Sequence, residues 1–66
     1  MKGDDAMLIY LGEIDCLEDL IDLVGEDEAR KVYRGKLNYF KDLSTDTIIA
    51  VSDFTAESIF ENGEVV

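Results

Sequence analysis

The chain has 66 residues, so it forms one small domain, residues 1–66, whose core is too small to enclose a deep substrate pocket as well. Its apolar fraction of 47% is ordinary for a globular protein and argues against disorder. The formal net charge of −10, from 16 acidic and 6 basic residues, repels nucleic acids and anionic membranes and attracts basic surfaces.

Charge is divided into three blocks along the chain. Residues 1–28 hold ten acids and one base, residues 29–41 hold five bases and no acid, and residues 42–66 hold six acids and no base. No apolar run approaches the roughly 18 residues of a membrane span, and the short run near the N-terminus has acids on both flanks, unlike a signal peptide. A single cysteine cannot form an intrachain disulfide, so a reducing, cytoplasmic setting is expected.

The first element is expected to be a strand. Residues 1–5 are predicted to be a flexible start, and Met7–Ile14 is a short apolar run rich in strand formers. Gly12 within this run indicates a β-bulge or a point of close packing.

A first helix is predicted from Cys16 to Val24, with Gly25 as the residue just past its C-terminus. One face is apolar and consists of Leu17, Leu20, Ile21 and Val24. Asp15 and Glu18 have the spacing of an N-cap and its capping-box partner. Cys16 is expected to be a small buried residue, because the acids around it disfavour a reactive thiolate.

The opposite face of this helix is almost wholly acidic. Its members are Asp15, Glu18, Asp19, Asp22 and Glu26. Asp22 lies four residues from Glu18 and three from Asp19, and like-charge pairs at these spacings cost roughly 0.2–0.5 kcal/mol each. A helix selected for stability alone would carry a base at this position, so the row of unpaired carboxylates indicates a binding function.

A second helix is predicted from Glu26 onward. Its core face consists of Ala29, Val32, Tyr33, Leu37 and Phe40. Acids at its start and bases after them suit the helix dipole, and they predict the ion pairs Glu26–Arg30 and Asp27–Lys31. Gly35 costs about 1 kcal/mol inside a helix. The alternative is therefore a helix that stops before Gly35, followed by a strand over residues 36–41, but the spacing favours the continuous helix.

The C-terminal third is predicted to contain a turn at Ser44–Asp46, a buried strand over Thr47–Val51 and a last helix that begins at an Ser52 N-cap and ends near Gly63. A hairpin turning at Asn62-Gly63 is the alternative, and it would leave only three residues for a returning strand. In the helical reading, three acids form a second ridge: Asp53, Glu57 and Glu61.

These elements predict an α+β fold in which a short β-sheet packs with two to three helices. The residues expected to supply most of the core are Leu8, Tyr10, Leu17, Leu20, Ile21, Val24, Val32, Tyr33, Leu37, Ile48, Ile49 and Phe60.

Catalysis finds little support in this composition. The chain has no histidine, so a nucleophile would lack a base of suitable pKa, and it has no Gly-rich phosphate loop or cysteine pair. The closest approach to a calcium loop, from Asp42 to Asp53, lacks the glycine at its sixth position and the glutamate at its twelfth. Neither an enzymatic activity nor a cofactor or metal site is therefore expected.

Recognition by charge is the remaining class of function. Carboxylates four residues apart on a helix are about 6 Å apart along its axis, close to the roughly 7 Å between successive phosphates of one nucleic-acid strand. A folded acidic surface can thus offer a nucleic-acid-binding protein much the same contacts as DNA. The competing explanation is a solvated face, since solubility alone also favours acidic surface residues.

In size, charge and α+β pattern, the chain resembles the small acidic phage inhibitors of host defence, such as anti-CRISPR and anti-restriction proteins. The stretches DCLEDLIDLVGEDE (residues 15–28) and DFTAESIFENGE (residues 53–64) carry the resemblance, which covers the character of the whole chain and includes no diagnostic motif. It implies a DNA mimic in the cytoplasm of a host bacterium, whose acidic residues occupy a basic nucleic-acid-binding surface of a Cas effector. The alternative is an antitoxin-like or phage regulatory domain that binds a protein partner through residues 30–41, around Tyr33, Tyr39 and Phe40.

Overall fold

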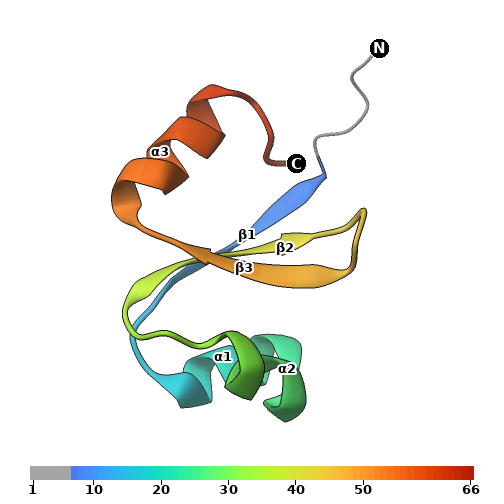
Figure 1. The fold of residues 1–66 in the computed structure, drawn as a ribbon, viewed down its shortest axis with the longest axis vertical. Coiled ribbons are helices and arrows are strands. Elements are labelled where there is room, and N and C mark those ends of the chain that lie inside the picture. The colour runs from blue at the N-terminus through green and yellow to red at the C-terminus, as the bar shows by residue number, and fades with distance from the viewer. Residues whose placement is uncertain (1–6) are drawn as a thin grey trace.

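The computed structural model describes residues 7–66, and the flexible start expected at residues 1–5 lies outside this range. The elements are, in order, β1 (Leu8–Ile14), α1 (Leu17–Val24), α2 (Glu26–Val32), β2 (Leu37–Asp42), β3 (Thr47–Val51) and α3 (Asp53–Glu61). The three strands form one antiparallel sheet in the order β1-β2-β3 (Figure 1). The α+β expectation is confirmed.

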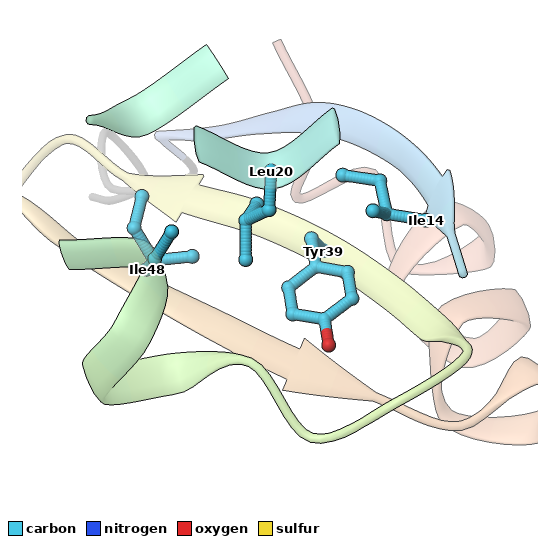
Figure 2. Close-up of a cluster of buried hydrophobic side chains, with 5 residues drawn as sticks. Ile14, Leu20, Tyr39 and Ile48 are labelled. Carbon is cyan, nitrogen blue, oxygen red and sulfur yellow. The ribbon is translucent and has the colours of Figure 1, made fainter. Parts of the chain in front are cut away.

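The sheet is the middle of three layers. Figure 1 shows α1 and α2 at one end of the long axis, α3 at the other end and the strands between them. Each face of the sheet has its own core. The cluster under α1 and α2 contains Ile14, Leu20, Ala29, Tyr39 and Ile48 (Figure 2). The cluster under α3 contains Leu8, Phe40 and Ala56. The molecule is accordingly long for its size, with extents of 37 × 23 × 14 Å.

The central strand β2 serves both cores because successive side chains of a strand point to opposite faces. Tyr39 packs under α1 and α2, and Phe40 packs under α3. Both side chains are 0% exposed. β3 alternates in the same way, with Ile48 in the first cluster and Ile49 against the second. The predicted strand over Thr47–Val51 is confirmed, but it is not a fully buried one: β3 is an edge strand in which Ile48 is buried, Thr47 is exposed and the other three residues are partly buried.

A β-bulge in β1 changes the face of the sheet to which its side chains point. Tyr10 pairs with Phe40 and Gly12 pairs with the adjacent Tyr39, so Leu11 is an extra residue in the ladder. An extra residue turns the side chains beyond it to the other face. Leu8 therefore reaches the core under α3, whereas Ile14 reaches the core under α1 and α2. The φ of Gly12 is 118°, a backbone conformation that side-chain-bearing residues rarely adopt, and the predicted bulge is confirmed.

The continuous second helix predicted through Phe40 is wrong, and the alternative strand is correct. α2 ends at Val32, since Tyr33 is already extended with φ −64° and ψ 127°. Gly35, with a φ of 101°, then lies in the loop before the strand. The Tyr39 hydroxyl donates a hydrogen bond to the Gly35 carbonyl oxygen (2.9 Å) and accepts one from the Arg34 N–H (3.0 Å). These bonds satisfy loop backbone groups that a longer helix would have paired.

The start of α1 also differs from the prediction. Its N-cap is Cys16, not Asp15, and no side chain caps it, so the Asp15–Glu18 capping box is not formed. Cys16 is exposed, contrary to the expectation of a buried residue. The reason is that β1 remains extended through its last buried residue, Ile14, and Cys16 itself is extended, with φ −143° and ψ 148°. The helix thus begins at Leu17, one residue later than predicted, and leaves Cys16 outside its first turn.

The C-terminal segment is a helix, as predicted, and not a hairpin. The Ser52 hydroxyl accepts a hydrogen bond from the Thr55 N–H (3.4 Å), which confirms the N-cap. At the other end the Gly63 N–H donates to Phe60 (3.1 Å) and the Glu64 N–H donates to Ile59 (3.3 Å). With Gly63 at φ 72°, this is the Schellman arrangement that satisfies the last helical carbonyls.

Most of the predicted core is confirmed. The predicted residues that are buried, or packed against a buried cluster, are Leu8, Leu17, Leu20, Ile21, Val24, Val32, Tyr33, Leu37, Ile48 and Ile49. Tyr10 and Phe60 are 39% and 45% exposed, because their rings form the open side of an aromatic group around Phe40. The buried hydrophobic residues absent from the predicted set are Ile14, Ala29, Tyr39, Phe40 and Ala56.

Replacing Leu20 with Ala should lower the free energy of unfolding by about 2–5 kcal/mol, because Leu20 is 0% exposed and its loss leaves a cavity. Leu23 on the same helix is 54% exposed, and its replacement with Ala should change stability by only about 0.5 kcal/mol or less. Urea denaturation followed by circular dichroism measures both. Equal losses for the two variants would mean that α1 does not pack through the Leu20 face.

Candidate functional site

The candidate site is the α1 acidic surface, which we define as Asp15, Glu18, Asp19 and Asp22. All four residues are exposed. Their position follows from the packing of α1, whose apolar face lies on the core, so that the acidic residues point to solvent. The last turn of α1 contains no basic residue. The helix therefore presents its acids on a short, rigid scaffold.

These four carboxylates have no partner among residues 7–66, in contrast to several other acids. Glu26 pairs with Arg30 (2.9 Å) and Asp46 pairs with Lys41 (3.1 Å). Asp42 accepts hydrogen bonds from the Ser44 hydroxyl and N–H, which lower the pKa of its carboxyl group. The α1 acidic surface takes part in neither kind of interaction within the described part of the chain.

Glu26 does not belong to this surface, although its sequence spacing placed it there. Gly25, with φ 96° and ψ 157°, separates α1 from α2, and Glu26 is the first residue of α2. Its carboxylate binds Arg30, which confirms that predicted ion pair. The second predicted pair, Asp27–Lys31, is not among the salt bridges of residues 7–66.

The second predicted ridge, on α3, is also exposed but is not uniform. The Asp53 carboxylate accepts a hydrogen bond from the Asn38 amide (2.6 Å), whose oxygen accepts one from the Tyr10 hydroxyl (2.8 Å). Asn38 is 5% exposed, so this chain of bonds satisfies a buried polar group and ties α3 to β2 and β1. Asp53 is therefore structural. Glu57 and Glu61 have no such partner among the described residues.

The two acidic ridges do not form one row. α1 and α3 cover opposite faces of the sheet and lie at opposite ends of the long axis (Figure 1). A flat partner surface can contact one of them, but not both at once. The structure thus brings Asp15, Glu18, Asp19 and Asp22 together and separates them from Asp53, Glu57 and Glu61.

Cys16 lies among the acids of the α1 surface, a feature that sequence reasoning missed because it placed the thiol in the core. One ligand atom each from Asp15, Cys16 and Asp19 lies within 4.8 Å of the others. All three residues are exposed, and exposed acids commonly approach this closely without a metal. Partial burial raises the pKa of the nearby Tyr33, and Tyr39, Cys16 and Asp15 act in the same direction.

In the alternative surface over residues 30–41, most of the apolar side chains expected to contact a partner are buried. Tyr39 and Phe40 are 0% exposed, so neither ring can contact a partner. Tyr33 is partly buried and stacks on Tyr39 with a centroid separation of 6.2 Å. What remains of that surface is a set of exposed bases: Arg30, Lys31, Arg34 and Lys36.

Comparison with known proteins gives no family assignment. No protein-family model matches the chain, and no curated protein or solved structure matches it significantly. Among residues 7–66, no helix combines the length and the apolar character that crossing a membrane requires.

Replacing Asp53 with Ala should destabilise the protein by about 1–3 kcal/mol, because it leaves the buried Asn38 amide without its acceptor. Replacing Glu57 with Ala on the same helix should change stability by only about 0.5 kcal/mol or less. Thermal unfolding compares the two variants. If both were neutral, the Tyr10–Asn38–Asp53 bonds would contribute nothing to the docking of α3.

Proposed function

We propose that this protein is a non-enzymatic inhibitor that mimics DNA and occupies a basic nucleic-acid-binding surface of another protein. The target class that fits best is a Cas effector, which would make the chain an anti-CRISPR protein. The α1 acidic surface makes the contact, and the acids of α3 are outside it.

One observation carries the proposal: four exposed carboxylates, three on α1 and that of Asp15 just before it, have no partner among residues 7–66. Their mutual repulsion lowers the stability of α1, and the helix dipole offsets it only for the acids of the first turn, Glu18 and Asp19, and not for Asp22. Elsewhere on the surface, acids such as Glu26 and Asp46 neutralise bases of the same chain. A row of unneutralised charge on a rigid element is what a basic partner requires, since its Lys and Arg side chains then replace phosphate contacts with carboxylate contacts.

The size of the expected effect distinguishes binding from solvation. Close charge pairs across a protein interface can couple by about 1.5–7 kcal/mol, whereas exposed pairs within one protein contribute about 0–1 kcal/mol. A surface that serves only solubility can therefore be reversed in charge at little cost. A surface that binds a basic groove cannot.

Replacing Asp15, Glu18 and Asp22 together with Lys should abolish displacement of DNA from the target while leaving the fold intact. The fold survives because none of the three side chains has a partner among residues 7–66. The matched control is the triple change of Glu57, Glu61 and Glu64 to Lys. This control alters the net charge equally at exposed positions on the α3 side of the sheet.

The assay measures release of fluorescent target DNA from guide-loaded Cas effectors of several types, with circular dichroism to verify the fold. We expect the control to inhibit as the parent does. Loss of inhibition in the control alone would move the binding surface to α3. Full inhibition by the α1 variant and by the control would leave both ridges as solvated faces.

The protein itself should show no gel shift with duplex DNA at physiological salt. Its exposed bases, Arg30, Lys31, Arg34 and Lys36, lie within a molecule of net charge −10, and Arg30 is paired with Glu26. Titration of labelled duplex with the protein tests this expectation. Tight, salt-sensitive binding would assign the molecule to direct nucleic-acid recognition and contradict mimicry.

A further inference from the structure

The two edges of the sheet differ in how they are protected from pairing with another strand. The outer edge of β1 is interrupted by the bulge at Gly12. Near the start of β1, the C-terminal residues of the same chain bond to this outer edge. The Leu8 N–H donates to the Glu64 carbonyl (3.1 Å), and the Val66 N–H donates to the Leu8 carbonyl (2.7 Å). Bulges and covering segments are the usual means by which proteins block an edge strand.

β3 has none of these protections. Its five residues, TIIAV, contain no charge and no proline, and they pair with β2 in an unbroken register. Among residues 7–66, no other backbone segment bonds to its outer side. Alternate N–H and C=O groups of an edge strand point outward, so β3 presents a regular, uncharged row of unpaired backbone groups.

We propose that the β3 edge is an interface for a second copy of this chain, which pairs with it through its own β3 in antiparallel fashion about Ile49. In this register Ile49 lies opposite its counterpart, Thr47 opposite Val51, and Ile48 opposite Ala50. The strand is thus complementary to itself. The product is one continuous six-stranded sheet.

Both cores continue across such an interface. Ile48 and Ala50 belong to the core under α1 and α2, and Ile49 and Val51 pack against the core under α3. Ile49, Ala50 and Val51 are only partly buried in the single chain. Antiparallel pairing brings Ile49 against its counterpart and Ala50 against Ile48 of the second copy, and it sets Val51 opposite Thr47. Each pair lies on one face of the sheet, where cross-strand contacts stabilise it.

The charges beside this edge are complementary in a two-fold pair. α2 packs against β3, and it carries acids in its first turn and Arg30 and Lys31 in its last. A two-fold axis perpendicular to the sheet reverses the direction of α2 in the second copy. The two α2 helices of the pair therefore run in opposite directions, with their acidic and basic ends reversed, so the repulsion between two chains of net charge −10 is lower than if like ends faced the same way.

This interface is independent of the proposed inhibitory function, since it uses no residue of the α1 acidic surface. It also has a consequence for that surface. In the six-stranded sheet, both α1 helices cover the same face, so the dimer presents two copies of the α1 acidic surface on one side.

The decisive experiment is sedimentation equilibrium of the unmodified full chain from micromolar to millimolar concentration. We expect a reversible dimer that tightens as salt is raised, because salt screens the repulsion between the two chains. A monomer at every concentration and salt would overturn the proposal. So would a dimer that dissociates as salt rises, because acid–base pairs and not the uncharged strand would then hold it.

Substitution of Ile49 with Lys should weaken the dimer by about tenfold or more, because it places like charges directly opposite one another at the two-fold axis. The matched control is Ile9→Lys, the same change on the other edge strand at a residue that is 39% exposed. The control should dimerise as the parent does. Loss of the dimer in the control alone would place the interface on β1.

Amide hydrogen exchange on the unmodified protein decides the question if Ile49→Lys fails to fold. In the dimer, all five N–H groups of β3 should be protected, and their protection should increase with protein concentration. Protection that alternates along β3 and does not depend on concentration would show a free edge and overturn the proposal.

Discussion

The burial of β2 on both faces is the constraint on which the rest of this structure depends. Tyr39 and Phe40 are adjacent in sequence, fully buried and directed to opposite sides of the sheet. A sheet with two apolar faces must be covered twice, so a chain of 66 residues divides its helices between two layers. Neither layer then provides a large core, and each depends on a few buried residues, such as Leu20 on one side and Ala56 on the other.

The bulge at Gly12 is the local consequence of this arrangement. With regular pairing, Leu8 and Ile14 would point to the same face, because they are six residues apart. The extra residue in β1 sends them to different cores. The Tyr39 hydroxyl makes a comparable contribution at the other end of β2, where it bonds two backbone groups of the loop that carries the chain from α2 into the sheet.

The elements that follow one local rule were predictable from the sequence. α1 shows a single apolar stripe, β3 a short apolar run, and α3 a serine at its start with a glycine after its end, and all three are found where these patterns placed them. β2 was misread because Leu37 and Phe40 continue the helical spacing of α2. Only its pairing with two other strands makes it extended, and that pairing is a property of the tertiary structure that no local pattern contains.

The candidate site was predictable in its composition but not in its extent. Helical spacing correctly grouped Glu18, Asp19 and Asp22 on the solvent side of α1. It wrongly added Glu26, because the break at Gly25 starts a new helix. The structural bond of Asp53 was also hidden, since Asn38 is 15 residues away in sequence.

The two-layer arrangement limits how this molecule can use its charge. Because the helices cover opposite faces, acids that are abundant along the sequence are divided between two ends of the fold, and neither end carries the whole excess. One acid at each end is engaged within the chain, Glu26 by Arg30 and Asp53 by Asn38, which removes it from any partner. Two more, Asp42 and Asp46, are engaged at the turn between β2 and β3. Net charge alone therefore overstates the surface available for recognition. What distinguishes the α1 acidic surface is not the number of its acids but that none of the four has a partner among residues 7–66, whereas α2 and α3 each have an acid engaged within the chain. A partner that responded only to total negative charge would bind the acids at either end of the molecule. A partner that requires neighbouring unpaired carboxylates should bind the α1 acidic surface.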